Sequence, residues 1–144
     1  MADPHNGGTS LSDNGFQPKH VNEMYLGEED NHGVHINSGI PNHAFYLFAT
    51  ALGDKDKAGD IFYKTLTDYL TKSSQFIDLR RGVIQAATDM YGEGSNEVAE
   101  AKNVFNAVGI TDGDMTDVFP TFPENPGEEY VLVYNTETTD DNTL

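Results

Sequence analysis

Residues 28–40 read EEDNHGVHINSGI and place three side chains that could do chemistry, Asp30, His32 and His35, in one short stretch. One carboxylate and two imidazoles could supply the three protein ligands of a catalytic zinc ion. The helical zinc motif, however, sets its two histidines four residues apart, and here they are three apart with a glycine between them. No H-E-x-x-H occurs anywhere in the chain. A zinc site made by this segment alone is therefore the weaker interpretation.

The second chemistry needs only one of the histidines. A carboxylate at Asp30 that binds one ring nitrogen of His35 would fix its tautomer and leave the other nitrogen to donate a proton or a hydrogen bond. The competing interpretation is an ordinary turn, in which the Asp and Asn side chains cap backbone N–H groups and the histidines are simply exposed. The spacing alone favours the turn, and both interpretations stay open at this point.

Two smaller clusters also carry charge. Asp112, Asp114 and Asp117 alternate as DGDMTD, a pattern that suits Ca²⁺, but the rest of an EF-hand loop is missing and a solvated linker is the better interpretation. Arg80 and Arg81 fall on a predicted helix, where we expect at least one of them to form a surface salt bridge. Neither arginine is assigned a function.

Composition limits the possible classes of protein. The 144 residues suffice for one domain with one hydrophobic core. The net charge of −16, from 24 acidic and eight basic residues, argues against nucleic acid as a partner, because phosphates are bound by clustered Lys and Arg. The lack of cysteine excludes disulfides and thiolate sites. No apolar run approaches the ~20 residues that cross a membrane, and the first residues have no signal-peptide pattern.

The elements that must position the histidines are helices. Residues 1–30 are rich in Gly, Asn, Asp and Ser, which predicts a loop. From residue 36 the apolar residues recur at steps of three and four, which predicts a first helix over about 36–52. This helix is expected to be capped by Asn37 or Ser38 and to end at Gly53.

Three further amphipathic helices follow, over about 55–71, 75–91 and 96–108. The apolar stripe of the 55–71 helix is expected to include Leu66 and Tyr69, and that of the 75–91 helix Met90. Ser73 or Ser74 should cap the 75–91 helix and Ser95 the last one. The fold class is therefore all-α, a bundle of four to five helices behind a long loop arm.

After residue 110 the pattern changes again. Residues 111–144 hold nine acidic residues and no Lys or Arg, which predicts an acidic linker. The run EYVLVYNT within them predicts a β-strand. Since a lone strand has no partner in an all-α domain, we expect it to begin a further domain of a longer protein.

Several of these motifs together resemble those of a known family. DNHGVHINSGIPNHAFYLFATALG resembles the D-N-G-G-V-H-x-N-S-G-I-x-N-x-A-x-Y-L stretch of thermolysin-like zinc metallopeptidases, and the helices from AGDIFYKTLTDYL to VFNAVGI are similar to that family's C-terminal helices. QPKHVNEMY, with Pro18, His20 and Tyr25, and the initial MADP resemble the segments that precede the motif. The resemblance covers about residues 1–110. It implies a loop arm over 1–35 that carries the catalytic histidine, a helical domain over 36–110, and an acidic segment over 111–144 that starts a further domain.

The resemblance also implies site residues. His35 falls on the family's catalytic histidine, which donates a hydrogen bond to the oxyanion during peptide hydrolysis, and Asp30 falls on the carboxylate that orients it. Asn37, Ser38 and Gly39 would shape the turn into the first helix. His32 stands where the family usually has glycine, so it is not expected to be a ligand and could sit in a mildly strained conformation with φ > 0.

Other parts of the family's machinery have no counterpart in this chain. The family's zinc is bound by H-E-x-x-H and a further Glu, and the Glu of the motif is the general base. These residues, a substrate-binding Arg and the usual calcium sites are expected upstream, in the zinc-binding half of a secreted parent endopeptidase. The implied partners are that half and a peptide or protein substrate, with Zn²⁺ and Ca²⁺ as cofactors of the parent. We expect the chain alone to be inactive.

Two rival functions are retained. The chain could be a non-catalytic helical binding or interaction module derived from the peptidase fold. It could also be one piece of a nicked or split peptidase that stays bound to the other piece. An in-frame H-E-x-x-H upstream would favour the peptidase over the module.

Overall fold

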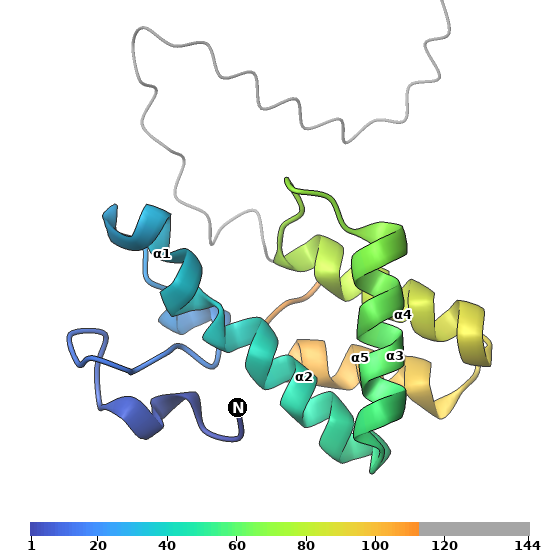
Figure 1. Cartoon of the computed structure of the whole chain (residues 1–144). Coiled ribbons are helices and arrows are strands. Elements are labelled where there is room, and N and C mark those ends of the chain that lie inside the picture. The colour runs from blue at the N-terminus through green and yellow to red at the C-terminus, as the bar shows by residue number, and fades with distance from the viewer. Residues whose placement is uncertain (113–144) are drawn as a thin grey trace, which may run out of the picture.

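The computed structural model describes residues 1–112, and within them the protein is helical with no strand (Figure 1). The predicted strand after residue 129 and two of the three alternating acids, Asp114 and Asp117, lie outside the described residues. In chain order the elements are η1 Pro4–Gly7, η2 Val21–Glu23, α1 Glu29–Asn37, α2 Gly39–Leu52, α3 Lys55–Lys64, η3 Thr65–Tyr69, α4 Phe76–Tyr91 and α5 Asn96–Ala107. No helix among residues 1–112 has the length and apolar character that crossing a bilayer requires.

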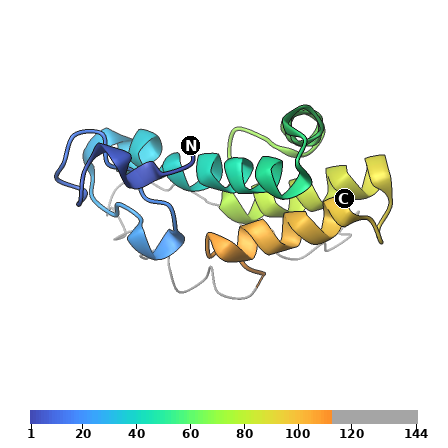
Figure 2. The same cartoon turned by 90° about the horizontal axis from the view of Figure 1, so that it is seen from below.

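Helices α2, α3, α4 and α5 form the bundle, which confirms the all-α prediction. Helix α5 packs against both α2 and α4, and Figure 2 shows α3 along its own axis where it packs against α2 and α4. The core between them is apolar and fully closed to solvent at its largest side chains, which include Ile40, Phe48, Ile61, Val83 and Phe105. Close packing of these side chains makes the bundle rigid. The segment around His35 is attached to the bundle because it leads directly into α2.

The second predicted helix is divided in two. A right-handed α-helix ends at Lys64, and a π-helical turn, η3, follows over Thr65–Tyr69. Thr65 takes the inward position: it is fully buried, its hydroxyl donates to the Ile61 carbonyl at 2.8 Å, and a Cβ at Gly82 would lie 2.8 Å from its methyl group. Leu66 consequently faces out and is 62% exposed, so its assignment to the apolar stripe was wrong.

Two other expected stripe residues also lie nearer the surface than predicted. Tyr69 is 37% exposed, and its hydroxyl donates to the Asp89 carboxylate rather than entering the core. Met90 is 39% exposed, in the last turn of α4. Both residues lie at the end of a helical element. The apolar periodicity of the sequence continues there, although the hydrophobic core of the bundle does not extend that far.

The helix starts were placed correctly within a few residues, but not every cap was. Ser95 caps α5 as predicted, with its Oγ 3.3 Å from the Val98 N–H. The α4 cap is Gln75, which forms a capping box with Asp78, so the prediction of Ser73 or Ser74 was wrong. Ser74 instead closes the preceding turn, where its Oγ accepts from the Thr71 N–H at 2.9 Å.

The two arginines of α4 have opposite environments. Arg81 is 64% exposed and pairs with Asp112 at 3.5 Å, the surface salt bridge that the sequence predicts. Arg80 is only 7% exposed, and its guanidinium donates to the side chain of Asn106 at 2.8 Å and to the carbonyl of Ile110 at 2.9 Å. This buried role, in which Arg80 links α4 to the end of α5, was not predicted from the sequence.

The arm before α1 is folded onto the bundle. It contains the two short 3-10 helices, and the N–H of Val21, a buried residue, donates to the Val108 carbonyl at 3.0 Å. Gly109 makes the close approach possible, because its φ is +81° and a Cβ there would lie 2.5 Å from the His20 ring. The expected loop over residues 1–35 is therefore an ordered arm, and its last residues already form the helical turns of α1.

Candidate active site

Segment α1 begins with a turn of the opposite hand. Asp30, Asn31, His32 and Gly33 have φ values of 56°, 49°, 63° and 79°, whereas the residues that follow are right-handed. Left-handed backbone is unfavourable for residues with a Cβ, and Asn, Asp and His tolerate it best. His32 has the positive φ that its replacement of a glycine suggested.

This left-handed turn folds Asp30 back over the residues that follow it. One carboxylate oxygen, Oδ1, lies 2.5 Å from Nδ1 of the His35 ring. The other, Oδ2, accepts from the backbone N–H of His35 at 2.8 Å and from that of Ile36 at 3.0 Å. A single carboxylate thus binds the ring and also satisfies the N–H groups that begin the right-handed turn.

Electrostatics follow from these contacts. The hydrogen bond with the His35 ring, and then the N–H of Ile36, hold the pKa of the Asp30 carboxyl below its ordinary value. Asp30 is therefore an acceptor, which assigns the shared proton to Nδ1 of His35. The His35 side chain is 85% exposed, and its Nε2 makes no hydrogen bond within residues 1–112. The ring presents one fixed nitrogen to solvent.

The backbone around His35 is held from a second side. Its carbonyl accepts from Oγ of Ser38 at 2.6 Å and from Nε2 of Gln17 at 2.7 Å. Asn37, expected to cap the first helix, is instead buried and exchanges two hydrogen bonds with the backbone of Tyr25, at 2.8 and 2.9 Å. Ser38 holds the N-cap position of α2 but makes no side-chain capping bond there.

The structure brings together Asp30 and His35 but builds no metal site around them. Residues 1–112 contain no group of three His, Asp or Glu side chains able to hold a metal ion. His32 lies on the same turn and is not a member of the Asp30–His35 pair. Asp112, the one described member of the acidic triplet, pairs with Arg80 and Arg81.

The contacts of Gln17 and Asn37 were missed by sequence reasoning, since both reach a partner at least 12 residues away. The only signal was indirect: Gln17 opens the QPKHVNEMY segment, and Asn37 lies in the motif itself.

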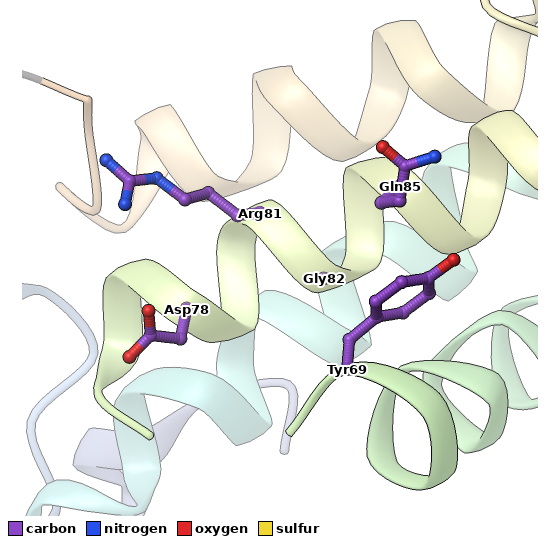
Figure 3. Close-up of a pocket in the computed structure, with 5 residues that line it drawn as sticks. All are labelled: Tyr69, Asp78, Arg81, Gly82 and Gln85. Carbon is purple, nitrogen blue, oxygen red and sulfur yellow. The ribbon is translucent and has the colours of Figure 1, made fainter. Parts of the chain in front are cut away.

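A separate, open depression lies where η3 meets α4. It measures about 240 Å³ and is lined by Tyr69, Asp78, Arg81, Gly82 and Gln85 (Figure 3). Tyr69 and Gln85 both donate to the Asp89 carboxylate, and Arg81 pairs with Asp112. The polar groups of Tyr69, Gln85 and Arg81 are thus already paired with neighbouring carboxylates, so the depression does not resemble a reaction centre.

Comparison with known proteins agrees with the fold and with the motif. The family model described as thermolysin metallopeptidase, alpha-helical domain, matches residues 1–110. The chain belongs to this family. It is 47% identical over 103 residues to thermolysin from Bacillus caldolyticus and 46% identical to the thermostable neutral protease of Geobacillus stearothermophilus. Both matches cover 65% of this chain and 19% of the relative, so the chain spans about a fifth of the length of these relatives.

A solved structure supports the same conclusion. The precursor of protealysin, a metalloproteinase from Serratia proteamaculans, superposes with a TM-score of 0.63 at 34% identity. The superposition covers 75% of this chain and 35% of that one. The Asp30–His35 pair lies within residues 1–110, the part of the chain that matches the family model.

Proposed function

We propose that this chain is the C-terminal part of a secreted thermolysin-like zinc metalloendopeptidase, in which His35 stabilises the transition state of peptide-bond hydrolysis. The observation that carries the proposal is the Asp30–His35 pair, an exposed imidazole fixed through one nitrogen, in a chain of this family. Secretion of the parent protein and the peptide substrate are inferred from the family alone.

The proposed roles follow from the geometry. When its ring is protonated, His35 can donate from Nε2 to the oxygen that becomes negative as water adds to a peptide carbonyl. Asp30 accepts the hydrogen bond from Nδ1–H of His35, keeps the ring direction and balances the positive charge. A donor held in place before the reaction needs no reorganisation when the charge appears, and loss of one such donor lowers kcat by about 10²–10³.

Zinc and the general base would come from the zinc-binding half of the same peptidase. Residues 1–112 do not fit a zinc ion, because they hold no set of three suitable side chains, and the sequence has no H-E-x-x-H. The face around His35 would form one wall of the substrate cleft against that half. The 144-residue chain on its own is therefore expected to hydrolyse no peptide.

The test compares the 144-residue chain with the full-length peptidase that contains it. Peptidase activity and one bound zinc ion are expected only in the full-length protein, and His35→Ala should lower its kcat by about 10²-fold or more. His43→Ala is the matched control: this half-buried histidine of α2 contacts the carbonyl of Met1 and should leave kcat unchanged. Full activity of the His35→Ala enzyme would refute the proposal.

The alternative is a non-catalytic binding or interaction module. Its supporting observation is that residues 1–112 keep the fold and hold no metal-ligand cluster. If no zinc-binding half is found with this chain in the cell, and the purified chain binds a peptide with an affinity that His35→Ala does not change, the module is the better description.

A further inference from the structure

The carbonyl oxygen of His35 receives two hydrogen bonds of different origin. Ser38, three residues later, moves with the same turn. Gln17 comes from the arm, 18 residues earlier, and its Nε2 lies 2.7 Å from the carbonyl and 3.3 Å from the Ser38 hydroxyl. The amide of Gln17 therefore connects the His35 turn to a separately folded part of the chain.

The backbone of the arm is held in place at Gln17. The backbone N–H of Gln17 donates to the Pro4 carbonyl at 3.0 Å, and the next residue, Pro18, is fully buried. Gly39, in the first turn of α2, lets the arm come close: a Cβ there would lie 2.5 Å from the Pro18 carbonyl and 2.6 Å from the Cβ of Gln17. Arm and helix are thus in backbone contact beside His35.

His35 has little else to hold it. Its side chain is 85% exposed, so packing contributes little to its direction. Asp30 binds the ring of His35 and accepts from the N–H of Ile36, which lies in the same peptide group as the His35 carbonyl that Gln17 binds. The His35–Ile36 peptide plane is thus held at both its N–H and its carbonyl, and its orientation sets the direction of the Cα–Cβ bond of His35, which carries the ring.

We propose that Gln17 is a positioning residue for His35, acting from the arm through the His35 carbonyl. This inference rests on the proposed function of His35. In this role Gln17 does not contact the substrate, but it maintains the direction in which Nε2 of His35 points. Because a misplacement of about 1 Å in a reacting group can lower a rate 10²-fold, loss of the anchor should reduce kcat more than it changes KM.

The first test needs no catalysis and uses the 144-residue chain. Gln17→Glu keeps the shape of the side chain but replaces the donating amide group by an oxygen that repels the carbonyl. The N–H groups of His35 and Ile36, which donate to Asp30, should then exchange with solvent about fivefold faster or more. Amides of the core, such as that of Val83, should keep their exchange rates.

Gln85→Glu is the matched control. It makes the same chemical change at a Gln whose Nε2 donates to Asp89 at 2.8 Å on α4, far along the chain from His35. It should leave the His35 and Ile36 exchange rates unchanged. Gln17→Met, which removes the donor without adding charge, replaces Gln17→Glu if that variant does not fold. Unchanged exchange at both amides, or equal acceleration across the core, would overturn the proposal.

The second test measures peptidase activity of the full-length protein in a double-mutant cycle. Gln17→Glu should lower kcat about tenfold in the native background and have no further effect in the His35→Ala background, because Gln17 acts only through His35. An equal loss in both backgrounds would overturn the positioning role. Full activity of His35→Ala would refute the proposed function instead, and the exchange result would still stand on its own.

Discussion

Replacing Arg80 by Met should destabilise the bundle far more than the same change at its neighbour Arg81. The guanidinium of Arg80 is 7% exposed and donates to the Asn106 side chain at 2.8 Å and to the buried Ile110 carbonyl at 2.9 Å. Methionine fills much of the same space, but both acceptors lose their partner. Hydrogen bonds from a charged donor contribute about 1.5–3 kcal/mol each, so after the apolar gain of Met we expect a loss of about 3–4 kcal/mol.

The assay is urea unfolding of the 144-residue chain, followed by far-ultraviolet circular dichroism, with the free energy of unfolding extrapolated to water. Arg81→Met removes the same charge from the same helix. Since Arg81 is 64% exposed and its ion pair with the half-exposed Asp112 spans 3.5 Å, this control should change stability by about 0.5 kcal/mol or less. Equal effects of the two substitutions would show that net charge, and not the buried hydrogen bonds, decides the result.

Two further predictions concern the turn that carries His35. Gly33→Ala should destabilise the chain by about 1–3 kcal/mol in thermal unfolding, and Gly53→Ala should destabilise it less. Both glycines have positive φ. A Cβ at Gly33 would lie 2.8 Å from Asn37 and from Tyr25, whereas a Cβ at Gly53 would meet nothing within 4 Å. The pKa of Asp30 is lowered in the folded state, so its stabilisation is fully present above its ordinary pKa of 3.8 and disappears as the pH falls through the lower folded value. Unfolding measured from pH 5 down to pH 2 should therefore depend less steeply on pH in Asp30→Asn than in the native chain.

The sequence was sufficient for the helices because a single apolar stripe repeats along each one. It failed where a distant residue decides the outcome. Thr65 and Leu66 show this: periodicity favours the leucine as the inward residue, but the missing side chain at Gly82 and the Ile61 carbonyl make room and supply a partner for the threonine. Arg80 was missed for the same reason, since its acceptors lie at least 22 residues away on α5 and beyond it.

The site illustrates a different limit. Spacing left two interpretations open, a carboxylate that binds His35 and a turn in which Asp30 caps backbone N–H groups. The structure contains both contacts in one side chain, because Asp30 has two oxygens and the left-handed turn brings each to a separate group. Backbone of that hand is rare for residues other than glycine, so a pattern of residue types could not have indicated the combination.

The same turn explains why the exposed ring of His35 still has a fixed direction. Three consecutive non-glycine residues, Asp30, Asn31 and His32, adopt the left-handed conformation, and strain of this kind persists only where the surroundings fix it. The three contacts of the Asp30 carboxylate provide that fixation, and they lie on the ring and the backbone of His35 and on the N–H of Ile36. The strained backbone and the oriented imidazole therefore depend on the same carboxylate. A change that relaxes the turn should also release the ring, so the geometry of the turn and the direction of Nε2 are expected to be lost together.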